Sequence, residues 1–493
     1  MRLKEISQFA AVPDEAGEII FTGICNNSKK IKPGDLFIAV PGCKTDGFLY
    51  IEEAFSRGAV AALAEKGTPK SLGQPVLAVE NIRKKQALIA AEFFGKPATK
   101  LRTIGVTGTN GKTTVTHLIE YLLNTAGKPT GLIGTVWIDD GKARERSDRT
   151  TPDSIELQRL LAEMVQNEVH TVVMEVSSHA LALERVAGID FDVAVLTNVT
   201  HDHFDFHRDY HHYLQSKLLL FEGLKAEPGG NKYAVANIDD PSFARIMEIC
   251  QVPVYSYGFL KSANTRIKGV QRGGFTSTLH ISLFGGEFKV ETRLPGGFNI
   301  YNILAAVTTG FQEGIQPDQL KQGIATFPGV PGRYQEINCG QPFRVMVDFA
   351  HNPAALENIL KMAKENTRGR RIVVFGCEGE KDRLKRPLMG KIAVENAEVP
   401  ILTADNIHHE DLDQIFEDVL KDLQPEERQR ILVEPDRGEA IKKAVALAKS
   451  GDFLIVAGKG HEEYLVKGSE YHRFNDLSVL REILAENWSA SKV

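Results

Sequence analysis

The sequence predicts an α/β protein of three domains. A central P-loop-type domain with a mostly parallel sheet and helices on both faces is flanked by a smaller N-terminal α/β domain and a C-terminal Rossmann-like α/β domain. Short apolar runs alternate with helical segments through most of the 493 residues, which exceed a single hydrophobic core. Gly/Pro breaks at 95–100 and 327–333 separate the units. We therefore expect domains at 1–98, 99–327 and 328–493.

The N-terminal unit alternates apolar runs with helical stretches. In chain order these are DLFIAV, FLYIEEAFSRG, VAALAE, VLAV and KKQALIAAEFFG. This βα alternation predicts a small parallel sheet with its own helices.

The central unit begins with the strand LRTIGVTG and the helix KTTVTHLIEYLLNTAG. TGLIGTVWI, TVVMEVSS and FDVAVLTNVT follow, each apolar and rich in β-branched residues. Such runs suit a parallel sheet covered on both faces. Around residues 265–296 the pattern becomes glycine-punctuated alternation, which predicts a small antiparallel patch.

The C-terminal unit has the strand candidates FRVMVDFA, RIVVFGC, VPILTAD and DFLIVAGKG. Helical stretches such as NPAALENILKMAKEN and GEAIKKAVALAKSG lie between them. The alternation predicts a second parallel α/β sheet.

Composition excludes several classes of protein. Apolar residues make up 42% and charged residues 25%, and the net charge of -5 lacks the basic footprint of a nucleic-acid or membrane-surface partner. The five cysteines are scattered without a CxxC pair, which argues against a disulfide framework or a structural zinc site. We see no signal peptide and no membrane-spanning run. We expect a cytoplasmic monomer.

The strongest local signal is GVTGTNGKTT at 105–114, between a strand and a helix. Gly108 and Gly111 let backbone N–H groups approach an anion, Lys112 supplies a charge, and the Thr113 hydroxyl suits Mg²⁺. The spacing departs from the standard phosphate loop, since five residues separate Gly105 from Gly111. The alternative is an ordinary glycine turn before a helix.

Polar residues also follow two buried strands, at the edge where open α/β sheets bind ligands. Glu175 and His203 are the metal-ligand candidates there, because a buried carboxylate needs a cation. Five of the fourteen histidines fall within 201–212, which raises the alternative of a metal-dependent hydrolase. Phe206 interrupts that ligand spacing, so we expect most of these histidines to be solvated and only His203 to act as a ligand.

Taken in order, these motifs resemble the Mur ligase family over nearly the whole chain. The motifs are GTNGKTT, EVSSH, TNVTHDHFDFH, YLQSKLLLF, FNIYNILAA, PGRYQEI, VDFAHNP, GCEGEKDRLKRP and AGKGHE. The resemblance implies a peptidoglycan ligase that uses ATP to form an acyl-phosphate. The members with the most similar motifs add the third amino acid to the carboxylate of UDP-N-acetylmuramoyl-L-Ala-D-Glu.

The family's roles carry over residue by residue. Lys112 and Thr113 would hold ATP phosphates and a first Mg²⁺, and Glu175 and His203 a second. Lys217 matches the lysine that CO₂ carbamylates. The remaining nucleotide contacts implied are Gly108, Thr109, Asn110, Gly111, Thr114, Asn302 for adenine, Arg333 for phosphate, and Asp348.

The substrate residues follow in the same way. Those matched to the UDP-linked acceptor are Ser28, Thr150, Thr151, Ser178 and Arg185. Those matched to the amino acid are Lys381, Asp405, Asn406, His408, Gly458 and Glu462.

Two of these positions depart from diaminopimelate-adding members. Their DNPR motif appears here as Asp405-Asn406-Ile407-His408, and a second family arginine appears as Lys381. Lysine and histidine do not reproduce bidentate binding of a carboxylate. These positions therefore argue against meso-diaminopimelate and make lysine or another amine at least as good a candidate.

Two further alternatives stay open. One is a ligase of the same family that acts on a non-peptidoglycan acceptor, as a folylpolyglutamate-type enzyme does. The other is a P-loop ATPase without ligase activity.

Overall fold

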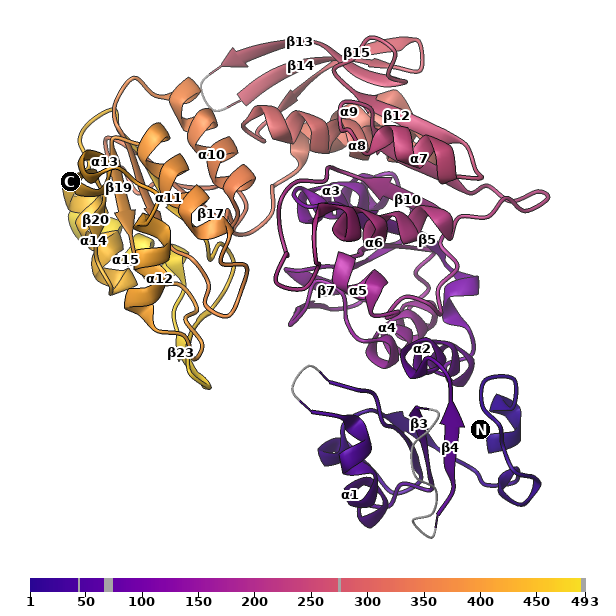
Figure 1. Cartoon of the computed structure of the whole chain (residues 1–493). Coiled ribbons are helices and arrows are strands. Elements are labelled where there is room, and N and C mark those ends of the chain that lie inside the picture. Colours follow the sequence, from indigo (N-terminus) through magenta and orange to yellow (C-terminus); the bar gives the residue numbers. More distant parts are fainter. Residues whose placement is uncertain (43–44, 66–73, 274–275, 489–493) are drawn as a thin grey trace.

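The computed structural model describes residues 1–42, 45–65, 74–273 and 276–488. The chain forms three α/β units, each with its own sheet, and the two termini lie in different outer units (Figure 1). This confirms the predicted three-domain α/β class. The four described cysteines are free thiols, while Cys43 lies outside the described residues.

The N-terminal sheet has four parallel strands in the order β1-β2-β3-β4. The strands are β1 (Gly23–Cys25), β2 (Asp35–Ile38), β3 (Ala61–Glu65) and β4 (Val76–Val79). Helices α1 (Ile51–Ser56) and α2 (Ile82–Phe93) complete the βα alternation. The last strand of this sheet ends at Val79 and the next sheet begins at Arg102, so the proposed boundary near 98 lies between two sheets.

The central sheet has eleven strands in the order β15-β14-β13-β12-β11-β10-β5-β9-β6-β7-β8. Its parallel centre consists of β5 (Arg102–Thr107), β6 (Thr130–Ile133), β9 (Thr171–Glu175), β10 (Val193–Leu196), β11 (Tyr233–Asn237) and β12 (Val254–Gly258). The short strands β7 (Trp137–Asp139) and β8 (Arg144–Arg146) form one edge. Successive side chains of a strand point to opposite faces, so this sheet supports a core on each side.

One face of the central sheet carries α3 (Lys112–Thr125), α8 (Gly297–Gln312) and α9 (Pro317–Thr326). The other carries α4 (Ser154–Gln166), α6 (Tyr210–Glu222) and α7 (Phe243–Ile249), with the short α5 (Ser178–Ala182) beside α6. Val173 of β9 packs with the first group, and its neighbours Val172 and Met174 pack with the second. Both faces are therefore buried, as the apolar runs predict.

The antiparallel segment is part of the central sheet. It comprises β13 (Thr265–Gly273), β14 (Thr276–Leu283) and β15 (Gly286–Thr292). Tyr257 of β12 pairs in parallel with Thr265 of β13, which joins the segment to the parallel strands. The expected separate patch is thus an extension of one sheet.

The C-terminal sheet has six strands in the order β16-β17-β21-β18-β19-β20. They are β16 (Gln335–Ile337), β17 (Arg344–Asp348), β18 (Arg371–Phe375), β19 (Val399–Leu402), β20 (Leu432–Val433) and β21 (Phe453–Ala457). Helices α10 (Pro353–Asn366), α11 (Lys385–Asn396) and α12 (Leu412–Leu420) cover one face, and α14 (Arg437–Leu447) and α15 (Asp476–Trp488) the other. The C-terminal domain also contains a short helix, α13 (Pro425–Arg430), and a separate hairpin of β22 (Tyr464–Lys467) and β23 (Glu470–Arg473).

The described part of the chain contains no helix with the length and apolarity needed to cross a bilayer.

Candidate active site

The predicted phosphate loop lies between β5 and α3, where the strand ends and the helix begins at Lys112. Gly111 has φ +89° and Gly108 has φ +147°, and a Cβ at Gly108 would collide with Thr197 Oγ1. The N–H of Thr109 donates to Asn198 O at 2.7 Å. The N–H of Asn110 donates to Asn198 Oδ1 at 3.1 Å. The first N–H groups of α3 have no acceptor within their own helix, and the helix dipole favours an anion there.

Two lysines share one carbonyl of this loop. Lys112 Nζ donates to Gly108 O at 2.9 Å, and Lys217 Nζ donates to the same oxygen at 2.8 Å. Burial, and next the neighbouring Lys112, hold the pKa of Lys217 well below its ordinary value. The Lys217 side chain is thus favoured as a neutral amine, the form that reacts with CO₂.

Glu175 ends β9 beside the loop and is fully buried. Its carboxylate accepts hydrogen bonds from Thr113 Oγ1 at 3.0 Å and from the Thr135 N–H at 2.7 Å. Carboxylate and hydroxyl oxygens are ligands that Mg²⁺ prefers. Among the described residues, no three His, Cys, Asp or Glu side chains converge as a metal-ligand cluster. Further oxygens for a cation would thus come from the nucleotide, from water or from a carbamate at Lys217.

Part of the histidine-rich segment 201–212 is buried, although the sequence predicts mostly solvated side chains there. Burial lowers the pKa of His203 to about 3, so its ring is neutral and able to act as a ligand. His207 is fully buried, and its Nε2 lies 3.0 Å from Ser178 Oγ. His207 is an exception to the expectation that most of these histidines are solvated, because its N–H bonds to His203 O and the turn directs its ring between α5 and α6. His211 and His212 are exposed, as expected.

A cavity of about 710 Å³ joins the loop to the C-terminal domain. Seventeen of the predicted site residues line it: Thr109, Asn110, Gly111, Lys112, Thr113, Thr114, Thr150, Glu175, His203, Asn302, Arg333, Asp348, Lys381, Asp405, Asn406, Gly458 and Glu462. Seven do not: Ser28, Gly108, Thr151, Ser178, Arg185, Lys217 and His408. Gly108 and Lys217 lie directly behind the lining, because Gly108 O accepts both from Lys112, which lines the cavity, and from Lys217.

The C-terminal domain closes this cavity through direct polar contacts. Asn352 Nδ2 donates to Asn110 Oδ1 and to Asp202 Oδ2, both at 3.0 Å. Arg333 Nη2 lies 3.3 Å from Thr113 Oγ1, which brings a cation to the phosphate loop. The structure therefore has the two domains in contact across the nucleotide end of the cavity.

The side chains expected to contact nucleotide cluster at that end. Asn302 Nδ2 donates to Asn299 Oδ1 at 2.9 Å, and Asn302 lies against Gly111. Asp348 accepts from the Tyr334 N–H at 2.8 Å, and burial raises the pKa of its carboxyl to about 6. The ring of Tyr334 lies 4.5 Å from that of Phe298, and both line the cavity. This end combines amide groups with aromatic rings, which suits a purine base.

Carboxylates of the C-terminal domain also line the cavity. Fully buried Lys459 donates to Glu462 at 2.6 Å and to Asn406 Oδ1 at 3.0 Å, and lies 3.6 Å from Asp405. Asp405 and Glu462, held by Lys459, form a carboxylate wall that suits an amino acid's ammonium group. His408 lies outside the cavity, with its Nε2 3.0 Å from Glu378 Oε1.

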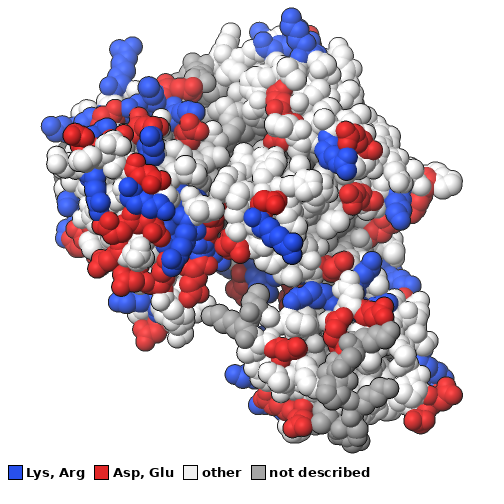
Figure 2. Space-filling model, in the orientation of Figure 1, with Lys and Arg blue, Asp and Glu red and all other residues white. Residues whose placement is uncertain are grey.

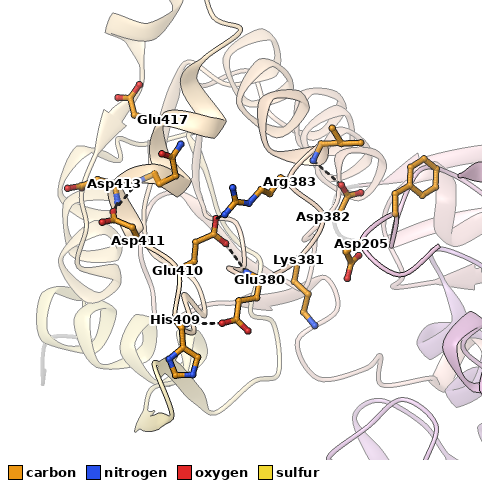
Figure 3. A pocket seen from close by; sticks show the side chains of 13 residues that line it. Asp205, Glu380, Lys381, Asp382, Arg383, His409, Glu410, Asp411, Asp413 and Glu417 are labelled. Atoms are coloured by element: carbon orange, nitrogen blue, oxygen red, sulfur yellow. Dashed lines mark hydrogen bonds and ion pairs between the residues drawn. The ribbon is translucent and has the colours of Figure 1, made fainter. Parts of the chain in front are cut away.

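An open groove of about 1020 Å³ adjoins the cavity, with which it shares Asp205, Lys381 and Asp382 (Figure 3). Seven carboxylate residues line it, in keeping with the mixed surface of the C-terminal domain, where acidic clusters stand among basic side chains (Figure 2). Arg383 pairs there with Glu410 at 2.6 Å. Lys381 lines both the groove and the cavity, and within the described part of the chain it has no hydrogen bond or ion pair (Figure 3).

Hydrogen bonds connect three of the residues matched to the acceptor, Thr150, Thr151 and Arg185, with one another or with the residues around Glu175. Thr150 Oγ1 lies 3.1 Å from Thr135 Oγ1, whose hydroxyl donates to the Glu175 carboxylate, and Thr151 Oγ1 donates to Glu175 O at 2.8 Å. Arg185 Nη1 donates to Thr151 O at 3.1 Å. Ser28 stands apart from them in the N-terminal domain, where it donates to Glu53 at 2.7 Å.

Sequence reasoning missed several groups in or beside the cavity. They are Asn198, Asp202, Tyr213, Asn352 and Lys385. Asn198 and Asp202 lie in the TNVTHDH string, directly after a buried strand, and that position could have identified them. The role of Asn352 depends on domain contact, and no local pattern reveals it.

Three family models match successive parts of the chain. They are "Mur ligase family, catalytic domain" at residues 20–93, "Mur ligase middle domain" at 106–310, and "Mur ligase, glutamate ligase domain" at 332–460.

Individual relatives match over nearly the full length. A UDP-N-acetylmuramoyl-L-alanyl-D-glutamate–2,6-diaminopimelate ligase from Syntrophomonas wolfei is 41% identical over 94% of each chain. A solved structure of a ligase with the same name is 29% identical, covers 99% of both chains and has a TM-score of 0.67. A folylpolyglutamate synthase from Mycobacterium tuberculosis is 16% identical, covers 83% of this chain and 95% of its own, and has a TM-score of 0.62. The last match shows a shared fold alone.

The cavity geometry and these matches agree on the enzyme class, an ATP-dependent acid–amino-acid ligase. The chain belongs to the Mur ligase family.

Proposed function

We propose that the protein adds diaminopimelate to UDP-N-acetylmuramoyl-L-Ala-D-Glu in peptidoglycan synthesis, and that it does so as a monomer in the cytoplasm. The substrates follow from the names of relatives that are 39–41% identical over at least 93% of the chain. The observation that carries the proposal is the single cavity that contains both the phosphate loop and the carboxylate wall at Asp405 and Glu462. An ATP-dependent ligation needs those two sets of groups to face one cavity.

The chemistry consists of two displacements. An oxygen of the acceptor carboxylate attacks the γ-phosphorus of ATP, ADP leaves, and an acyl-phosphate forms. The amine then attacks the acyl carbon, inorganic phosphate leaves with that oxygen, the nitrogen loses a proton, and an amide remains. Lys112 and Arg333 lie where the first displacement concentrates negative charge, and preorganised cations of this kind stabilise phosphoryl transfer.

Magnesium fits the oxygen donors on this side of the cavity. Thr113 and Glu175 would hold it next to the phosphates, with neutral His203 and carbamylated Lys217 as further ligands. The bound ion would offset phosphate charge. The roles of these four residues are part of the proposal.

The names of the relatives disagree with the sequence interpretation about which amino acid the enzyme adds. His408 and Lys381 argue against diaminopimelate, yet the relatives are named for it. The contacts offer a physical explanation. Glu378 lines the cavity and holds His408 behind the lining, while Lys381, which has no ion pair among the described residues, lines the cavity and can meet a second carboxylate.

The test is phosphate release from ATP with each substrate omitted in turn. We expect release only when the UDP-linked dipeptide acceptor and meso-diaminopimelate are both present, with one amide formed per phosphate. Release without any acceptor would identify a simple ATPase. Turnover with a folate acceptor in place of the muramoyl dipeptide would contradict the proposed substrate.

A further inference from the structure

Tyr213 touches three parts of the proposed site. It is fully buried on α6, four residues before Lys217, and its ring centroid lies 4.3 Å from Lys217 Nζ. Its hydroxyl lies 3.1 Å from Thr109 Oγ1 in the phosphate loop. Its ring also packs against His203, with 6.2 Å between the centroids. It does not line the cavity, so any influence on the reaction passes through these neighbours.

The surrounding hydrogen bonds fix the direction of the contact with Thr109. Thr109 Oγ1 accepts from the Thr200 N–H at 2.9 Å and lies 3.2 Å from Thr200 O. A carbonyl oxygen only accepts, so the single hydroxyl hydrogen of Thr109 goes to Thr200 O. The Tyr213 hydroxyl therefore donates to Thr109 Oγ1, and this buried threonine hydroxyl has all its partners.

This contact bears on both lysines of the site. The carbonyl of Gly108 accepts from Lys112 and from Lys217, and the carbonyl of Thr109 accepts from Lys112 at 2.9 Å. A shift of the Gly108–Thr109 backbone would move the Nζ atoms of both lysines together. The tyrosine ring meanwhile covers the Lys217 end group on the same helix face, since residues four apart on a helix are neighbours.

We propose that Tyr213 is a positioning residue that fixes the Gly108–Thr109 segment and, through its two carbonyls, orients Lys112 and Lys217 for phosphoryl transfer. The inference rests on the proposed ligase function, because a displaced lysine would slow the phosphoryl-transfer step of that reaction.

The test compares Tyr213→Phe with Tyr233→Phe in the full-length protein. Each variant removes one buried hydroxyl from the central domain and keeps the ring. Tyr233 donates to Glu313 at 2.8 Å, and neither residue lines the cavity. Loss of one buried hydrogen bond that acts on the transition state corresponds to about a tenfold fall in kcat. We expect that fall for Tyr213→Phe, with KM for the acceptor and for diaminopimelate within about twofold of wild type.

Amide hydrogen exchange distinguishes a local change in the loop from a general loss of stability. Amides of residues 108–112 should exchange faster in Tyr213→Phe and at the wild-type rate in Tyr233→Phe. Wild-type kcat in Tyr213→Phe, or an equal loss in both variants without local exchange, would overturn the inference. Absence of acceptor-dependent turnover in the wild-type enzyme would instead refute the proposed function.

Discussion

Lys381→Met tests how the amino acid is recognised. The lysine lines the same cavity as Asp405 and Glu462 and has no hydrogen bond or ion pair among the described side chains, so its charge is available to a ligand. Diaminopimelate carries a second carboxylate that lysine lacks. Removal of the ammonium group should therefore weaken binding of diaminopimelate and leave L-lysine unaffected.

The size of the effect follows from the surroundings of Lys381. Its side chain is exposed, so solvent screens the interaction, and a single point charge lacks the bidentate geometry of arginine. A charge-assisted hydrogen bond at such a position contributes about 1.4 kcal/mol, which equals about a tenfold rise in KM. Lys381→Arg, which keeps the charge and adds a planar fork, should bring KM back to the wild-type value or below it.

The assay is steady-state phosphate release with either amino acid varied at saturating ATP and acceptor. Arg383→Met is the matched control, because Arg383 lies in the same segment, is already paired with Glu410 and lines only the groove. We expect its KM for diaminopimelate to match that of wild type. An equal rise of KM for both amino acids in Lys381→Met, or no rise for either, would refute the assignment of Lys381 to the distal carboxylate.

The remaining predictions concern the charged groups of the site. Lys112→Ala should reduce amide formation at least about a thousandfold, because the cation beside the transferred phosphoryl group is lost, and near-normal turnover would remove the phosphate-loop argument. Lys217→Met should abolish the carbamate signal in ¹³C NMR spectra recorded with labelled bicarbonate, and an unchanged signal would show that the carbamate lies elsewhere. His408→Asn should destabilise the protein by about 0.5 kcal/mol at low pH only. The hydrogen bond with Glu378 raises the pKa of His408 above 6.5, so its stabilisation is full below pH 6.5 and is lost as the pH rises through the raised value. Denaturation midpoints at pH 5.5 and pH 9 test this, and an equal loss at both would contradict it.

Much of the fold could be predicted from local patterns. Apolar runs such as 171–175 and 193–196 are strands buried on both faces, and Gly108 and Gly111 mark the strand-to-helix loop because their backbone angles require glycine. The antiparallel strands at 265–292 were identified as such, but their attachment to the central sheet was not. That attachment depends on the pairing of Tyr257 with Thr265, which periodicity does not encode.

The site could be predicted where its residues follow strands or share a motif. Glu175, His203 and the loop line one cavity as the resemblance implies. Burial of His207 was missed because the turn from His203, not the spacing of the histidines, directs its ring inward. Interdomain contacts such as Asn352 with Asn110 were also missed, since they arise only when separate domains meet.

The fate of the acceptor's carboxylate oxygen tests the central claim most directly. Acceptor labelled with ¹⁸O in its reactive carboxylate is incubated with ATP and diaminopimelate, and the released phosphate is analysed by mass spectrometry. Attack of that carboxylate on the γ-phosphorus predicts one ¹⁸O atom in each phosphate released. Phosphate that carries no label, with oxygen taken from water, would contradict an acyl-phosphate intermediate.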